Sequence, residues 1–279
     1  MSILNSIILG IIQGLTEFLP ISSTAHLTLA GKFINVVNLD HPEQWTAFMA
    51  VIQLGTLLAV LVYFRKEILN ISLAFTQENF ARKPLAQQSL DSRLGWMVIL
   101  GTIPVVVIGL GFKHVIEGVL TKSVFVIAVN LVLFGLILGF AEKWAKHRKT
   151  MAQTTLMDSF LIGVAQAFAL FPGASRSGTT MTAGLLLGIK RSEAAKLSFL
   201  LSIPAVFASG VLELHQAMKW VDQSQILELA VGTLTAFVTG YLAVSTLITF
   251  LKKYSNLVFV FYRVIFGAGL LGLLYLGKI

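Results

Sequence analysis

The sequence of 279 residues contains no cysteine, and charged side chains make up only 12% of it. The absence of cysteine excludes disulfide bonds and metal or iron–sulfur sites with thiolate ligands. The charged fraction is less than half of the roughly 25% that is usual in soluble domains. Hydrophobic residues account for 56%, and the mean hydropathy is +0.83. These values exclude a string of soluble domains and predict a polytopic helical protein with a single membrane domain over residues 1–279.

Basic residues are missing from the start of the chain. No lysine or arginine precedes Lys32, so the basic segment that begins a cleavable signal peptide is absent. The net charge of +8 would suit nucleic acid, but the basic residues flank apolar segments and do not form one patch. Such flanking indicates membrane orientation. We therefore expect membrane lipids, and no nucleic acid, as partners.

Six apolar segments are long enough to cross a hydrocarbon core that needs about 20 residues. They lie roughly at 45–64, 94–112, 123–142, 195–214, 226–250 and 257–277. Two further regions, about 3–33 and 157–188, each consist of a short apolar run, a break at a proline and a second short run. Runs of this length more often form re-entrant or buried segments than full crossings. The sequence therefore predicts an all-α fold with six spans and two re-entrant helix hairpins.

The distribution of lysine and arginine orients this layout. If the termini and the first hairpin lie outside, fourteen basic residues face the cytoplasm and five face outward. The fourteen are Arg65, Lys66, Arg82, Lys83, Arg93, Lys143, Lys146, Arg148, Lys149, Lys190, Arg191, Lys196, Lys252 and Lys253, and the five are Lys32, Lys113, Lys122, Lys219 and Lys278. This asymmetry follows the positive-inside rule. It also makes the two hairpins enter the membrane from opposite faces.

The two halves of the chain resemble each other. Gly101-Thr102 with Gly109 corresponds to Gly232-Thr233 with Gly240, and each half reads as a hairpin followed by three spans. Because three is an odd number, the second copy is inverted relative to the first. We expect inverted repeats at about 1–145 and 155–279, with polar sites on broken helices near the midplane where the repeats meet.

Two polar stretches interrupt the hairpins. The first runs Gln13-Gly-Leu-Thr-Glu17-Phe-Leu-Pro20-Ile-Ser22-Ser23-Thr24-Ala-His26, and the second runs Phe171-Pro172-Gly173-Ala-Ser175-Arg176-Ser177-Gly178-Thr179-Thr180. Ionisable groups at membrane depth are functional candidates. In the second stretch, glycine permits close approach to a ligand, a helix N-terminus attracts anions, and arginine matches phosphate geometry. We expect Gly173, Ser175, Arg176, Ser177 and Thr180 to bind phosphoryl oxygens.

The first stretch offers different chemistry. His26 lies three residues after Ser23, which on a helix puts the two side chains on one face, so the imidazole could activate the hydroxyl. Glu17, on one face with Gln13, could orient His26, hold a cation or take a proton. The hydroxyls of Ser22, Ser23 and Thr24 could instead cap a helix start.

Arg263 begins the last span in an apolar stretch. It could reach the surface from the helix end, or it could act as a second cation for a doubly phosphorylated ligand. Gln53 is an intramembrane amide that could join helices by hydrogen bonds and is a weaker site candidate.

Both polar stretches match a known family. The first resembles the glutamate-rich motif of the undecaprenyl-diphosphate phosphatases of the bacitracin-resistance type, and the second resembles their Pro-Gly-x-Ser-Arg-Ser-x-x-Thr motif. The similarity covers essentially the whole chain, including Tyr262-Arg263. It implies an integral enzyme of the bacterial inner membrane that removes the terminal phosphate of undecaprenyl diphosphate, with its site open to the periplasmic or outer side. The monophosphate carrier for cell-wall polymers would be regenerated, with bacitracin resistance as a consequence.

The position at the start of the glutamate-rich motif is Gln13 in this chain. With Glu17 as the only carboxylate of the stretch, a tightly held metal ion is not expected. A Mg²⁺ or Ca²⁺ ion bound loosely with the diphosphate, near Glu17 and Gln13, fits better. The sequence does not specify the metal, the preferred prenyl chain length or the oligomeric state, so a homodimer stays open.

Combining the two stretches gives a mechanism. Ser23 is the preferred nucleophile, with His26 as base and Glu17 in support. Arg176 stabilises the transferred phosphoryl group, while Ser22, Thr24, Ser175, Ser177, Thr180, Gly173 and Arg263 bind the diphosphate. Attack by water or by Ser175 stays open. So does a different function, because inverted repeats with broken helices are also typical of transporters: the chain could move or flip a prenyl phosphate or another anion.

Overall fold

The computed structural model describes residues 2–36, 42–111, 123–217 and 223–278. Within these ranges the secondary structure is helical, apart from an isolated β-bridge between Lys149 and Ile189. The α-helices are α1 (Ile3–Phe18), α2 (Ser23–Phe33), α3 (Pro42–Tyr63), α4 (Arg65–Phe80), α5 (Leu90–Gly111), α7 (Val124–Trp144), α8 (Leu156–Ala167), α9 (Arg176–Leu186), α10 (Arg191–Ala217), α11 (Gln223–Leu251) and α12 (Leu257–Tyr275). Short 3-10 turns lie at Leu85–Gln87, Met151–Gln153 and Phe168–Leu170.

Six of the described helices are long and apolar enough to cross a membrane, and they confirm the predicted all-α fold with six spans. Their apolar stretches are Trp45–Tyr63, Leu90–Gly111, Val124–Trp144, Arg191–Leu212, Ile226–Leu251 and Leu257–Tyr275. Each lies within a few residues of the segment that hydropathy predicts. The chain is therefore a multi-pass membrane protein.

Helix α4 is a helix that the hydropathy pattern did not predict. It continues from α3 after Phe64, none of its residues is buried, and it packs against α5. Phe75 of α4 contacts Trp96 of α5 edge to face, with the ring centroids 5.2 Å apart. Because α4 is not apolar on average, a scan for apolar runs treats it as a loop, and its contacts with α5 and with Lys196 of α10 reveal its place.

The two predicted hairpin regions each contain two short helices joined by a tight turn. Helices α1 and α2 flank the turn at Pro20, and α8 and α9 flank the turn at Pro172. Ser22 and Ser175 cap α2 and α9 with φ angles of 74° and 72°, a region that residues other than glycine rarely adopt. Their hydroxyls accept hydrogen bonds from the amides of Ala25 and Gly178. The two turns therefore share one local geometry.

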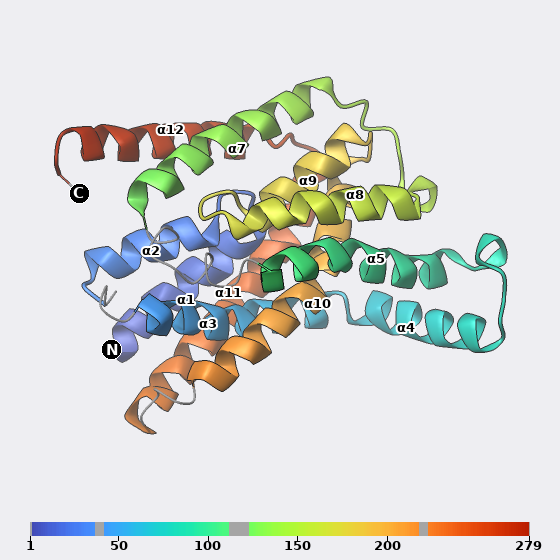
Figure 1. The fold of residues 1–279 in the computed structure, drawn as a ribbon, viewed down its shortest axis with the longest axis horizontal. Coiled ribbons are helices and arrows are strands. Elements are labelled where there is room, and N and C mark those ends of the chain that lie inside the picture. The colour runs from blue at the N-terminus through green and yellow to red at the C-terminus, as the bar shows by residue number, and fades with distance from the viewer. Residues whose placement is uncertain (1, 37–41, 112–122, 218–222, 279) are drawn as a thin grey trace.

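Close helix contacts between the halves run along glycines. Helix α1 packs along α11, and α8 packs along α5. A Cβ on Gly10 would lie 2.5 Å from the carbonyl oxygen of Gly232, and a Cβ on Gly163 would lie 2.1 Å from that of Gly101. Helices α7 and α12 also pack together, as do α3 and α10, and Figure 1 shows α7 beside α12. One face of each of the short helices α1 and α8 is thus held against a long helix of the other half by close backbone contact.

Replacement of Gly163 by alanine should destabilise the protein, because its methyl group would collide with the backbone of α5. Overpacking of this kind costs about 1–3 kcal/mol. The matched control is Gly269→Ala in α12, where nothing lies within 4 Å of the new Cβ. We expect Gly163→Ala to lower the midpoint of thermal unfolding in detergent, while Gly269→Ala leaves it unchanged or raises it. Equal midpoints for the two variants would contradict the close packing of α5 and α8.

Candidate active site

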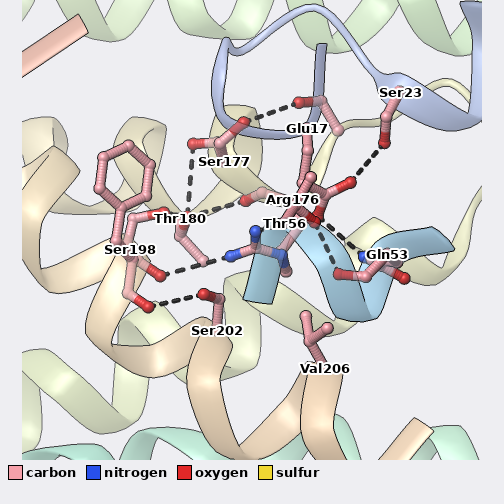
Figure 2. A network of polar contacts seen from close by, with 12 residues as sticks. Glu17, Ser23, Gln53, Thr56, Arg176, Ser177, Thr180, Ser198, Ser202 and Val206 are labelled. Carbon is pink, nitrogen blue, oxygen red and sulfur yellow. Dashed lines mark hydrogen bonds and ion pairs between the residues drawn. The ribbon is translucent and has the colours of Figure 1, made fainter. Parts of the chain in front are cut away.

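The turns of the two hairpins touch each other in the interior of the bundle. The hydroxyl of Ser177 donates a hydrogen bond to the carbonyl oxygen of Leu19 at 3.0 Å. Arg176 Nη2 forms an ion pair with Glu17 Oε1 at 3.1 Å. Figure 2 shows these side chains converging from both halves of the chain. The predicted juxtaposition of the two polar stretches is therefore present.

The carboxylate of Glu17 is the centre of this network. Its Oε2 accepts hydrogen bonds from Ser23 Oγ at 2.7 Å and from Gln13 Nε2 at 3.0 Å. Its Oε1 accepts from Gln53 Nε2 at 2.8 Å and from Arg176 Nη2 at 3.1 Å. Four donors, the usual capacity of a carboxylate, thus surround a side chain that is only 5% exposed. Sequence reasoning ranked Gln53 too low, although an intramembrane amide was the signal that could have found it.

Arg176 keeps part of its guanidinium free. Besides its ion pair with Glu17, Nη1 donates to the carbonyl oxygen of Ser198 at 3.4 Å. Its buried Nε has no partner among the described residues. A guanidinium binds phosphate through two parallel N–H groups, and in Arg176 the Nε–H group is the one left unpaired.

A cavity of about 380 Å³ lies beside this network, a size typical of small-molecule sites. Its wall includes eight of the predicted site residues: Gln13, Glu17, Ser22, Ser23, Thr24, Gly173, Ser175 and Arg176. The remaining wall comes mainly from apolar side chains of α3, α5 and α10, such as Met49, Val105 and Val206. The cavity therefore joins a polar end to an apolar end.

Two helix N-termini face this polar end. Helix α2 begins at Ser23 and α9 begins at Arg176, and both residues line the cavity. Unpaired N–H groups and the positive ends of helix dipoles favour an anion at such positions. Gly173, with a φ of 89°, passes so near α7 that a Cβ would lie 2.4 Å from the carbonyl oxygen of Ile127. The backbone at these two helix starts and at Gly173 therefore has the features that favour an anion.

His26 does not contact Ser23, and the expected hydrogen bond between them is wrong. Its Nδ1 lies 2.7 Å from the carbonyl oxygen of Ser22, and its Nε2 lies 2.6 Å from the hydroxyl of Tyr262. Since a carbonyl only accepts, Nδ1 carries the proton and Nε2 accepts from Tyr262 in the neutral ring. The ring also stacks on Phe266, and His26 is not part of the cavity wall. The hydroxyl of Ser23, the first residue of α2, points instead to Glu17.

Arg263 neither reaches the surface nor lines the cavity, so its expected place beside a ligand is also wrong. The side chain is fully buried and donates to five carbonyl oxygens at 2.9–3.3 Å. These belong to Pro20 of the first turn, Gly173 and Ala174 of the second turn, and Asn130 and Leu131 of α7. Arg263 therefore fastens both turns to one another and to α7.

Ser177 and Thr180 lie behind the cavity wall. Thr180 Oγ1 donates to the carbonyl oxygen of Arg176 at 2.7 Å and pairs with the hydroxyl of Ser198 at 2.6 Å, as Figure 2 shows. Ser177 is fully buried and bonds to Leu19 and Ser175. The structure thus places these two predicted ligands as supports for the turns and for Arg176.

The residues around Glu17 do not fit a resident divalent cation. All four acceptor positions of the carboxylate are filled by protein donors, and Gln13 turns its amide nitrogen toward it. No cluster of three or more histidine or acidic side chains suited to a metal occurs in the described ranges. An ion at Glu17 would have to displace these donors.

Comparison with known proteins gives consistent matches. Residues 6–269 match the family model described as bacitracin resistance protein BacA. The undecaprenyl-diphosphatase of Syntrophobacter fumaroxidans is 54% identical over 99% of this chain and 98% of its own length. Those of Myxococcus xanthus and Chlorobaculum tepidum are 48% and 44% identical over the whole of this chain, covering 91% and 99% of their own lengths.

Loss of the Arg263 side chain should destabilise the fold strongly, because buried carbonyl oxygens of both turns would lose their donors. Each unsatisfied buried group costs about 1–3 kcal/mol, so Arg263→Met should cost at least several kcal/mol. Arg148→Met, at an exposed arginine, is the control and should leave stability nearly unchanged. Thermal unfolding in detergent measures both, and a small effect at Arg263 would contradict its role as a fastener.

Proposed function

The chain belongs to the family of bacitracin resistance proteins of the BacA type, and from this premise we propose that it hydrolyses undecaprenyl diphosphate to undecaprenyl phosphate and inorganic phosphate. The product is the lipid carrier for cell-wall polymers, and its regeneration accounts for bacitracin resistance. One observation carries the proposal: two helix N-termini and Arg176, whose Nε is unpaired among the described residues, border a cavity that is also lined by Ser23 and Glu17, which are hydrogen-bonded to each other. Such a site combines anion binding with an activated hydroxyl.

The diphosphate occupies the polar end of the cavity. The free N–H groups at the starts of α2 and α9 and the unpaired Nε–H group of Arg176 bind its oxygens. Ser22, Thr24, Ser175 and Gly173 form the wall around it. The prenyl chain leaves along the apolar wall of α5 and α10, since the cavity is too small to hold the whole lipid.

The reaction proceeds by transfer of the terminal phosphoryl group to Ser23. The Ser23 oxygen forms a bond to phosphorus, the bond from phosphorus to the bridging oxygen breaks, and undecaprenyl phosphate leaves. The hydroxyl proton passes to Glu17 Oε2, 2.7 Å away. Water then attacks the phosphorus of phosphoserine and the bond from phosphorus to the serine oxygen breaks. The serine oxygen takes back the proton held by Glu17, and inorganic phosphate leaves with the oxygen and protons of the water. Arg176 stabilises charge on the transferred group in both steps.

Glu17 takes the part of base that sequence reasoning gave to His26. Both ring nitrogens of His26 are engaged with Ser22 and Tyr262, so His26 holds the turn before Ser23. Ser175 is a weaker nucleophile candidate, because its hydroxyl caps α9 and pairs with Ser177. Direct attack by water is the remaining rival, and it would use the same carboxylate.

We further infer that the two halves are inverted repeats with re-entrant hairpins, so that each helix of the first half corresponds to one helix of the second half. In this correspondence, α1 and α5 of the first half match α8 and α11 of the second half. The packing of α1 on α11 therefore corresponds to the packing of α8 on α5. Helix α3 corresponds to α10 and α7 corresponds to α12, and in both cases the two corresponding helices pack against each other. The common geometry of Ser22 and Ser175 supports the same correspondence.

The site opens to the outer side of the inner membrane. Its lining residues come from the first half of α3 and the second halves of α5 and α10, such as Thr46, Leu110 and Ser209. The basic loops lie at the opposite ends of these helices, where Arg93 bonds to Thr154 and Lys196 pairs with Glu67. Both termini lie at one end of the bundle, away from the loop between α4 and α5 (Figure 1). Positive-inside orientation therefore puts the cavity outside.

The expected Mg²⁺ or Ca²⁺ ion stays a prediction. Because the donors around Glu17 leave no position for it, its ligands would be substrate phosphates and water, as is common for Mg²⁺. Phosphate release measured with and without a chelator tests this expectation.

Ser23→Ala should reduce phosphate release from undecaprenyl diphosphate by at least about a thousandfold, as loss of a nucleophile does. Thr249→Ala, at an exposed threonine of α11, is the control for folding. Transfer through Ser23 also predicts retention of configuration at a chiral terminal phosphorus, because two in-line displacements occur. Inversion, or a variant that stays active, would favour direct attack by water.

Arg176→Lys should lose most of the activity, since a point charge cannot pair with Glu17 and also offer two parallel donors to phosphate. Removal of a comparable electrostatic donor costs about a hundredfold to a thousandfold in kcat. Near-normal turnover would remove Arg176 from the site.

These assays use purified protein in detergent without a bilayer, where transport cannot register. The correspondence between the two halves is also typical of transporters. Absence of phosphate release under these conditions, from protein that remains folded, would therefore favour a carrier of prenyl phosphates over a phosphatase.

A further inference from the structure

Gln166 of α8 is a buried amide in the cavity wall that lacks hydrogen-bond partners. Its side chain is fully buried, and neither Nε2 nor Oε1 has a partner among the described residues. Buried polar groups are nearly always paired, so each exception requires an explanation such as strain, a function, or a partner that is a water molecule or a ligand. Gln88 is a contrasting case: it bonds through Nε2 to Asn79 and Lys83 and through Oε1 to Ser92.

The place of Gln166 follows from the packing of α8 on α5. Gly163 touches the backbone of Gly101, and Gln166 lies one turn further along α8, on the same face. Val105, one turn after Gly101 on α5, lines the same cavity. Gln166 therefore lies where the polar turns give way to the apolar wall.

An unpaired amide is costly at this position. Methionine or leucine would fill similar space without burying groups that water can no longer reach, so glutamine lowers the stability of the empty protein. A ligand that enters the cavity with hydrogen-bonding atoms removes this penalty. Among the described residues of the wall, Arg176 Nε is the other unpaired buried group, and Arg176 bonds to the same carboxylate, that of Glu17, as the Ser23 hydroxyl.

We propose that Gln166 is a substrate-binding residue whose Nε2 donates a hydrogen bond to the lipid-linked phosphate of the bound prenyl diphosphate. Its Oε1 accepts from water that enters with the head group. The inference rests on the proposed function. It assigns a different side-chain donor to each of the two phosphates of the head group. Arg176 binds the phosphate that is transferred, and Gln166 binds the phosphate that stays on the lipid at the start of the apolar wall.

The test compares Gln166→Met with Gln88→Met in the purified full chain. Loss of one hydrogen bond to a charged group should lower kcat/KM for prenyl diphosphate about tenfold to a hundredfold. Inhibition by the prenyl monophosphate should weaken by a similar factor, whereas inhibition by inorganic phosphate should not change. The thermal midpoint of Gln166→Met should equal or exceed that of the parent protein. Gln88→Met should show the reverse, with lower stability and unchanged kcat/KM.

A more stable Gln166→Met protein with unchanged kcat/KM and unchanged monophosphate inhibition would overturn the proposal, because the amide would then be a structural cost only. Should this variant not fold, Gln166→Glu keeps the shape and places a carboxylate at the phosphate. It should lower kcat/KM further, and normal kinetics would equally overturn the proposal.

Binding separates this inference from the proposed function. A prenyl methylenebisphosphonate, which cannot be hydrolysed at the bridge, should bind the parent protein about tenfold to a hundredfold more tightly than Gln166→Met. If the parent protein releases no phosphate, the proposed hydrolysis is wrong, but a weaker Gln166→Met complex would still support the contact. Equal binding by the two proteins would refute it.

Discussion

The bonding of one fully buried arginine, Arg263, to backbone carbonyls determines where the two turns lie. No acidic side chain neutralises it among its recorded hydrogen bonds, which all go to carbonyl oxygens. A buried charge is tolerated only when its donors are satisfied. Here the breaks between helices supply three of the five acceptors, because a chain that turns at Pro20 and again at Pro172 leaves carbonyl groups without helical partners. The other two acceptors are carbonyl groups of α7. The cost of burying the arginine and the cost of breaking two helices inside the membrane protein therefore offset each other.

The hydrogen bonds of Arg263 also position the side chains of the candidate active site. Pro20 and the residues before Ser175 are held on either side of the ion pair between Glu17 and Arg176. Tyr262, next to Arg263, holds His26 and through it the carbonyl of Ser22. Tyr262 and Arg263, two neighbouring residues of α12, thus fix the backbone around Ser23. Their effect on the reaction is through position, since neither lines the cavity.

Much of the fold could be predicted from the sequence, because membrane spans follow from hydropathy alone. The six spans and the breaks at both prolines were predicted close to where they lie. Helix α4 was missed because its contacts with α5, and not its composition, place it in the bundle. Composition carries no information about such tertiary contacts.

The candidate site was predictable in content but less so in detail. Residue types identified Glu17, Ser23 and Arg176, and the structure brings these three together. Helical spacing paired Ser23 with His26, but the first residue of a helix lies beside the preceding turn, and its hydroxyl reached Glu17 instead. Arg263 was predicted to bind the diphosphate, because the sequence does not reveal that unpaired carbonyl groups of two distant turns lie beside it. Gln53 reaches Glu17 from another helix, which no local pattern in the sequence encodes.

The distribution of satisfied and unsatisfied groups links stability to function. Glu17 is surrounded by four donors and Arg263 by five acceptors, so the framework of the site does not depend on a ligand. Within the cavity wall, the Nε of Arg176 and the amide of Gln166 have no hydrogen-bond partner among the residues that the structure describes. Under the proposed function, the polar head group pairs with these unpaired donors, while the hydrogen bonds of Glu17 and Arg263 hold the backbone in place. Preorganised donors of this kind are the main source of electrostatic catalysis, and in this protein they are held by the helices that flank the two turns, α1 and α2 at Pro20 and α8 and α9 at Pro172.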